Sequence, residues 1–182
     1  MDLFDIINLL YYFIFASLLI VAFVYDFKHK LIPDFTSYGI FTLAAIRIIS
    51  LFIIHNSSFI ILSYDFLAAL AVLVLFGGIW YFFQGRAMGF GDVKLAPAIT
   101  LFLGFSNGIL AILLSFWLGS IIGLLLIGYS KFRSWHNKDR GLVGGFSLKS
   151  EIPFGPFLVL GALIALLWGE KIISLYFQFL LY

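Results

Sequence analysis

Cysteine is absent from this chain, and charged residues make up only 11% of its 182 residues. Without cysteine there is no disulfide, no thiolate zinc site and no cysteine nucleophile. The three histidines, His29, His55 and His136, do not have the spacing of a metal site. We therefore expect neither a metal nor another cofactor, and the net charge of +2 gives no reason to expect a nucleic-acid partner.

Hydrophobic residues make up 63% of the chain, and the mean hydropathy is +1.13. A soluble chain of this length could not bury so many apolar side chains. Apolar runs near 20 residues recur, which is the length that crosses a hydrocarbon core of ~30 Å. The sequence therefore predicts an all-α polytopic membrane protein, in contact with the lipid bilayer and folded as one domain over residues 1–182.

Six apolar segments are predicted to form transmembrane helices, at residues 6–25, 35–54, 59–83, 93–105, 109–129 and 153–168. The chain begins with acidic residues and no cleavage signal follows, so the first span is expected to be retained. The fourth segment is too short to cross alone and must rely on its neighbours, local thinning or extra turns. The tail at 172–182 is expected to lie in the membrane interface.

Lys and Arg are distributed unevenly between the predicted loops. The first, third and fifth loops hold nine of the eleven, and the second and fourth hold none. The nine are Lys28, Lys30, Arg86, Lys94, Lys131, Arg133, Lys138, Arg140 and Lys149. By the positive-inside rule, these loops face the cytoplasm and both termini lie outside the cell membrane.

One short segment, residues 88–95, reads Met-Gly-Phe-Gly-Asp-Val-Lys-Leu. Gly89 and Gly91 are expected to shape a loop through positive φ angles and close helix approach, with Asp92 near a helix N-terminus. Asp26 closes the first apolar run on the same predicted face. A lone acid there is more often a helix cap or topology marker, but two acids at the membrane rim usually carry function. We predict that Asp26 and Asp92 meet.

Two adjacent carboxyl groups cannot both ionise easily, so they share a proton. One then activates water while the other donates to a carbonyl oxygen, which hydrolyses a peptide without metal. The helix ends favour Asp92 as the resting base and Asp26 as the resting acid, whereas Lys28 and Lys30 oppose that division.

Three blocks of residues carry a family resemblance: Tyr25-Asp26 with the segment 31–34, the segment 89–95, and Pro153 to Phe157. Together they resemble the type IV prepilin leader peptidases, membrane aspartyl proteases of the GxGD kind. The resemblance implies a GxGD-type helical bundle, with Asp26 and Asp92 as the catalytic pair. It implies cleavage of the short, positively charged leader of prepilin-like proteins at the cytoplasmic membrane face.

Longer members of that family carry a cytoplasmic module with paired cysteines and also N-methylate the new pilin N-terminus. This chain has no cysteine and no room before Asp26 for such a module. It is similar to the short, peptidase-only forms, and methyl transfer is not expected.

Three other interpretations remain at this stage. A small transporter or channel would use Asp26, Asp65 and Asp92 to relay protons or bind a cation. A presenilin-like protease would be longer and would carry Pro-Ala-Leu where this chain has Pro153-Phe154-Gly155. A non-catalytic assembly protein of a pilus or secretion machine would keep the fold without activity. The particular substrate and the oligomeric state are left open.

Two structural contacts are also expected. Arg47 and Asp65 lie about two turns from the same uncharged hairpin, so they are predicted to pair between the second and third spans. Gly119, Ser120 and Gly123 predict a face of small residues on the fifth span, suited to close helix packing.

Overall fold

The computed structural model describes residues 3–53, 59–86, 88–136 and 153–180, and these residues form six α-helices without a strand. The helices are α1 (Leu3–His29), α2 (Asp34–Ile53), α3 (Phe59–Phe82), α4 (Phe90–Leu103), α5 (Phe105–His136) and α6 (Gly155–Leu180). All except α4 are long and apolar enough to cross a membrane. The predicted all-α polytopic fold is confirmed. The predicted hairpin at 55–58 and most of the last loop lie outside the described residues.

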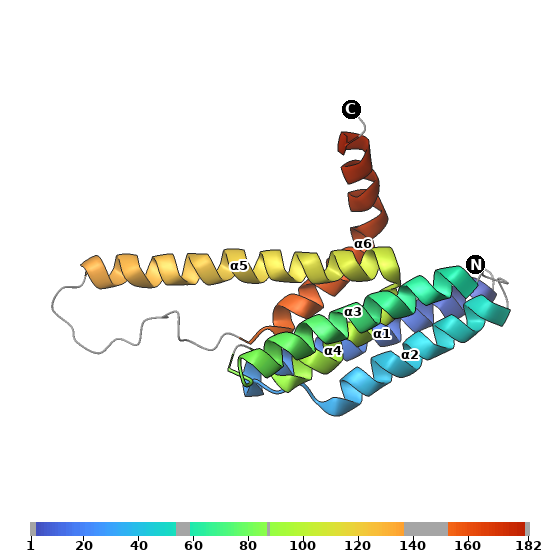
Figure 1. The fold of residues 1–182 in the computed structure, drawn as a ribbon, viewed down its shortest axis with the longest axis horizontal. Coiled ribbons are helices and arrows are strands. Elements are labelled where there is room, and N and C mark those ends of the chain that lie inside the picture. The colour runs from blue at the N-terminus through green and yellow to red at the C-terminus, as the bar shows by residue number, and fades with distance from the viewer. Residues whose placement is uncertain (1–2, 54–58, 87, 137–152, 181–182) are drawn as a thin grey trace.

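The short helix α4 occupies the centre of the bundle (Figure 1). It has 14 residues, eleven of them buried, and it packs against α2, α3, α5 and α6. At 1.5 Å per residue it is only about 21 Å long, so surrounding helices cover what it cannot reach. The expectation that this segment depends on its neighbours is confirmed, and the helix continues through Pro97.

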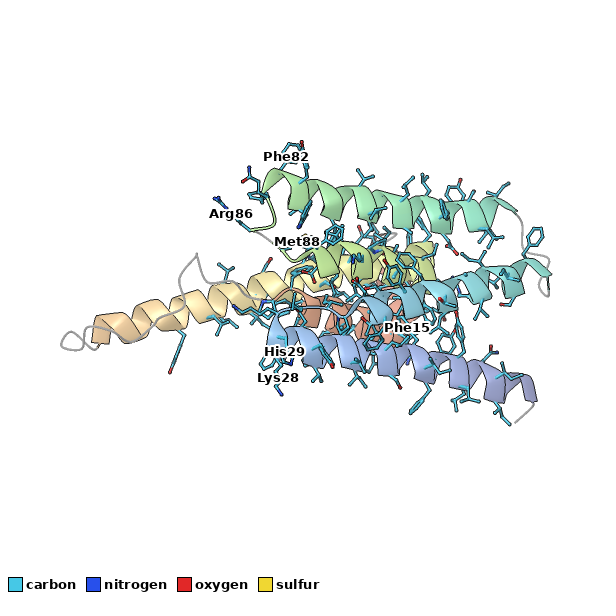
Figure 2. All side chains as sticks on the ribbon, turned by 90° about the horizontal axis from the view of Figure 1, so that it is seen from below. Phe15, Lys28, His29, Phe82, Arg86 and Met88 are labelled. Carbon is cyan, nitrogen blue, oxygen red and sulfur yellow. The ribbon has the colours of Figure 1, made fainter. Side chains whose placement is uncertain are left out.

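Aromatic stacking joins α1 to α4 inside the bundle. The rings of Phe15 and Phe102 stack with their centroids 3.7 Å apart, and both side chains are buried. Figure 2 shows Phe15 directed from α1 into the bundle. Exposed Leu, Ile and Phe side chains cover the outer faces of the long helices. Such faces suit contact with lipid, because an apolar side chain there loses nothing by leaving water.

The later helices differ from their predicted bounds. Helix α5 continues to His136, seven residues beyond the predicted end, and its last part projects past the bundle (Figure 1). A Cβ at Gly119 would lie 3.3 Å from the Phe157 ring, whereas Gly123 has nothing within 4 Å. The predicted small-residue face is therefore a packing face only at Gly119.

The predicted break after residue 168 is wrong, because α6 is one continuous helix. Its last part nevertheless turns away from the other helices, as the red end of the ribbon in Figure 1 shows. That this tail lies in the membrane interface stays a prediction.

One end of the bundle gathers the end of α1 and the beginnings of α2, α4 and α6 (Figure 1). Lys28 and His29 at the end of α1 lie at this end, as do Arg86 and Met88 before α4 (Figure 2). The two predicted site acids belong to these same helix ends.

Candidate active site

Asp26 lies in the last turn of α1. The helix ends just after it, because Lys30 takes a left-handed φ of 53° and its N–H donates to the Asp26 carbonyl at 2.8 Å. Asp26 is only 5% exposed. The backbone N–H of Gly155, at the start of α6, donates to its carboxylate.

Gly155 fits against Asp26 because it has no side chain. A Cβ at this position would lie 2.9 Å from the Asp26 Cγ and closer still to Oδ2. The block from Pro153 to Phe157 therefore packs directly on the first acid. Sequence reasoning assigned this block only to the start of the last span and missed the contact, although a glycine between Phe154 and Pro156 was the available signal.

Asp92 is the third residue of α4. Its N–H donates to the Gly89 carbonyl, and its Oδ2 accepts from the Gly89 N–H, each at 3.2 Å. The predicted position near a helix N-terminus is confirmed. Asp92 is 3% exposed.

Of the two properties predicted for the glycines, close approach is confirmed at Gly91, whereas the positive φ angles are wrong. Gly89 has φ −70°, an extended conformation open to other residues, and Gly91 is inside α4 instead of a loop. What Gly91 supplies is close approach: a Cβ there would lie 2.7 Å from the Ile32 Cβ. The loop-shaping role is therefore wrong for Gly91, because helix packing and not backbone conformation requires its small size.

Asp26 and Asp92, 66 residues apart in the chain, line one cavity of about 220 Å³. Asp26 Oδ2 and Asp92 Oδ1 are both buried, and neither has a hydrogen-bond partner among the described residues. Buried carboxyl oxygens normally have partners, so this pair is available for a water or a substrate group.

Burial and, to a smaller extent, the neighbouring Asp26 carboxyl together raise the pKa of Asp92 to about 7, while the Gly89 N–H opposes the shift. The helix N-terminus therefore does not keep the pKa of Asp92 low, because desolvation outweighs the helix dipole. Which of the two acids is the resting base stays a prediction.

An ion pair flanks the cavity. Lys94 Nζ donates to Asp34 Oδ1 at 2.6 Å and lies 4.9 Å from the centre of the Phe90 ring. This ion pair and the contact between Gly91 and Ile32 together hold the start of α4 against the start of α2. The residues that follow α1, from Ile32 to Asp34, therefore connect the helix that carries Asp26 to the helix that carries Asp92.

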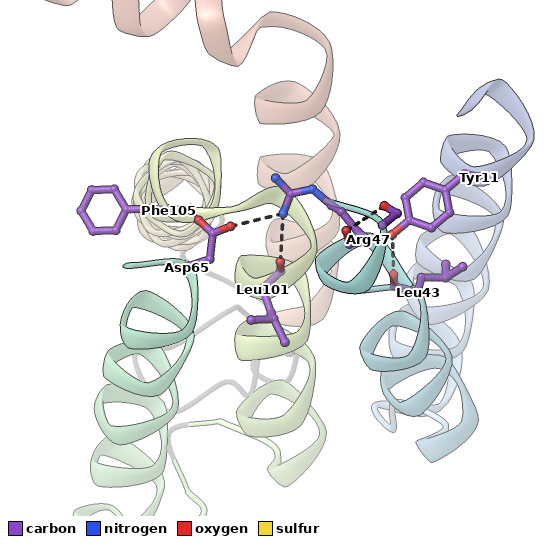
Figure 3. A network of polar contacts seen from close by, with 7 residues as sticks. Tyr11, Leu43, Arg47, Asp65, Leu101 and Phe105 are labelled. Carbon is purple, nitrogen blue, oxygen red and sulfur yellow. Dashed lines mark hydrogen bonds and ion pairs between the residues drawn. The ribbon is translucent and has the colours of Figure 1, made fainter. Parts of the chain in front are cut away.

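The third buried acid, Asp65, lies elsewhere. Its Oδ2 is 3.5 Å from Arg47 Nη1, and its Oδ1 accepts from the Phe105 N–H at 2.7 Å (Figure 3). The predicted pair of Arg47 and Asp65 is confirmed. It holds the junction of α4 and α5, where Gly104 has a left-handed φ of 81°. Among the described residues, no three His, Asp or Glu side chains gather closely enough to hold a metal ion.

The fold and this site define a polytopic helical membrane protein with two carboxyl groups facing one cavity at one end of its bundle. Residues 13–124 match the type IV leader peptidase family. The chain belongs to this family.

Similar proteins include prepilin leader peptidase/N-methyltransferases. That of Legionella pneumophila is 31% identical over 176 residues, covering 93% of this chain and 54% of the relative. That of Pseudomonas aeruginosa is 31% identical over 160 residues, covering 85% of this chain and 48% of the relative. This chain thus spans about half the length of these relatives. No solved structure matches it.

Proposed function

We propose that this protein is an aspartic endopeptidase that removes the leader from prepilin-like proteins, with Asp26 and Asp92 as its catalytic pair. The observation that carries the proposal is the cavity lined by both acids, each with a buried carboxyl oxygen that no described residue satisfies. The family and the names of the similar proteins support the choice of substrate.

The chemistry follows from one proton shared between the two carboxyl groups. The ionised carboxylate accepts a proton from water, which attacks the carbonyl carbon of the scissile peptide. The protonated carboxyl donates to the carbonyl oxygen and stabilises the charge that forms there. One carboxyl group then donates its proton to the leaving nitrogen, while the other carboxylate takes a hydroxyl proton back from the tetrahedral intermediate. The C–N bond breaks, and the pair again holds one proton.

Each acid depends on a different helix junction for its position. Gly155 holds the Asp26 carboxylate from α6, and Gly89 holds the Asp92 carboxylate at the start of α4.

The proposal includes a membrane orientation. The positive-inside distribution supports a cytoplasmic site and two outside termini, in the inner membrane of the cell.

The decisive experiment is incubation of the purified protein with a prepilin in detergent or nanodiscs. Asp26→Asn and Asp92→Asn should each lower the rate of leader removal by about a thousandfold, because each removes one half of the proton-sharing pair. Asp65→Asn is the matched control: it neutralises a buried acid outside the cavity and should keep leader removal.

A melting curve of each variant separates loss of chemistry from loss of fold. Leader removal that survives in a folded Asp26→Asn or Asp92→Asn protein would end the two-carboxyl mechanism.

A further inference from the structure

A second polar cavity lies at the opposite end of the bundle from the two site acids. It has a volume of about 590 Å³, and its lining includes Leu103 at the end of α4 and residues 166–171 of α6. Figure 1 shows that the last part of α6 turns away from the other helices. Along α1, its lining residue Tyr12 is 14 residues from Asp26, which corresponds to about 21 Å. Along α2, Arg47 is 13 residues from Asp34, or about 20 Å. This outer cavity is therefore separate from the candidate active site.

The outer cavity collects charges of both signs in a chain that has few charges. Arg47 from α2 and Lys171 from α6 line it, as does Glu170. Glu170 and Lys171 are exposed, and neither forms an ion pair with another described residue. Both contacts of the Arg47 guanidinium use Nη1, which lies 3.5 Å from Asp65 Oδ2 and donates to the Leu101 carbonyl at 3.5 Å. Lys171, Glu170 and the guanidinium nitrogens of Arg47 other than Nη1 can thus meet a ligand that itself carries both charges.

The walls of the outer cavity are those of a membrane interface. Tyr12 and Trp168 are about half exposed, and such aromatic side chains concentrate at the level of lipid headgroups. Leu166 and Leu167 continue the lining as apolar surface.

The short length of α4 explains why the cavity exists. This helix is about 9 Å shorter than a ~30 Å hydrocarbon core, and its last residue, Leu103, lines the cavity. At this end of the bundle, the central helix α4 therefore stops before the long helices around it do. The space beyond its last residue admits a polar group from the bilayer surface.

We propose that the outer cavity binds one phospholipid whose headgroup carries a primary ammonium, as in phosphatidylethanolamine. The phosphate lies between Arg47 and Lys171, because both are strong phosphate partners. The ammonium donates to the Glu170 carboxylate, and the acyl chains follow the leucine wall. The volume lies within the ~300–1,000 Å³ range of small-molecule sites.

The three charges also predict which lipids bind less well. Phosphatidylglycerol offers no cation to Glu170 and brings a net negative charge beside it. Phosphatidylcholine has a cation without N–H donors, so it cannot hydrogen-bond the carboxylate. The expected order is phosphatidylethanolamine first, with the two others about threefold to tenfold weaker.

Native mass spectrometry of the full chain in detergent, titrated separately with the three lipids, tests this order. Lys171→Gln should weaken phosphatidylethanolamine binding by about threefold to tenfold, because it removes a phosphate partner. Glu170→Gln should weaken it similarly and should remove most of the preference over phosphatidylglycerol. Arg86→Gln, an exposed cation at the other end of the bundle, is the matched control and should change nothing.

A competition arm separates a lipid headgroup from a free anion. Millimolar inorganic phosphate should not displace the bound lipid, because phosphate gains nothing from the apolar wall. Equal binding of the three lipids, displacement by phosphate, or unchanged binding in both Lys171→Gln and Glu170→Gln would overturn the proposal. Since prepilin cleavage is not the readout, these outcomes are independent of the proposed peptidase activity.

Discussion

Asp92 is a residue on which two physical effects act in opposite directions. It lies in the first turn of α4, where the helix dipole and the Gly89 N–H favour a carboxylate. Burial and the Asp26 carboxyl favour the protonated form, and together they raise its pKa to about 7. Desolvation prevails, so the Asp92 carboxyl keeps its proton to a higher pH than an exposed aspartate does.

This shift predicts how stability depends on pH. The folded pKa of Asp92 lies above the unfolded value of 3.8, so its contribution is fully present below that value and is lost as pH rises through about 7. The wild-type melting temperature should fall between pH 4.5 and 8 more steeply than that of Asp92→Asn. Each pKa unit corresponds to about 1.4 kcal/mol, so a difference of at least about 1 kcal/mol is expected. Parallel pH profiles would contradict it.

A second residue-scale prediction concerns Gly155. Gly155→Ala should lower the leader-removal rate by at least about tenfold, because the added Cβ displaces the Asp26 carboxylate. Gly78→Ala on α3 is the control, because nothing lies within 4 Å of a Cβ there. If the two alanine variants cleave equally well, the contact between Gly155 and Asp26 has no catalytic consequence.

At the scale of elements, the position of α4 decides the geometry of the site. Lys94 and Asp34 hold its first turn, and the group of Arg47, Asp65 and Phe105 holds the junction at its other end. We therefore expect changes at the start of α4 to lower activity and changes at its end to lower stability.

At the site end, Lys94→Asp and Asp34→Lys should each lower kcat/KM by about tenfold, because α4 is then free to shift relative to α2. The double variant restores an opposite-charge pair and should recover most of the loss. Steady-state cleavage of a prepilin by the four proteins measures this coupling. A double variant as poor as the worse single variant would argue that the pair does not position Asp92.

At the far end, Arg47→Ala should lower the free energy of unfolding by about 1–3 kcal/mol, because Asp65 keeps a buried charge without its cation. Leader removal at low temperature should remain, since the site lies about 20 Å away. Adding Asp65→Asn should recover part of the stability, because an amide oxygen still accepts from Phe105. Lost activity with an unchanged melting temperature would reverse this assignment.

At the scale of the whole molecule, the bundle has two chemically different ends. The acids, Lys94 and Asp34 lie at one end, and Arg47, Asp65 and the outer cavity lie at the other. Since charged loops remain in the cytoplasm, the first end is proposed to face inward.

The lack of cysteine makes this orientation directly measurable, because an introduced thiol is unique. Ser106→Cys, in the exposed first turn of α5, should react with a membrane-impermeant thiol reagent in intact spheroplasts. Arg86→Cys, before α4, should react only after lysis. The reverse pattern would place the candidate active site outside and contradict the proposed orientation.

The sequence by itself determined the class of the molecule. Apolar runs require helices in a bilayer, since each backbone polar group must be satisfied internally. The resemblance carried by the three blocks pointed to the family and to Asp26 and Asp92 as candidates, and two isolated charges in apolar spans predicted the pair of Arg47 and Asp65. These conclusions depend on local composition and on motifs, which are contained in the one-dimensional order of residues.

Only the tertiary structure decided what lies against each acid. It showed that Gly155 packs on Asp26 and that Gly91 is small because Ile32 approaches it. It also showed that burial outweighs the helix end at Asp92. Contacts between helices and desolvation depend on the distances between segments that are remote in the chain, and residue order alone does not determine those distances.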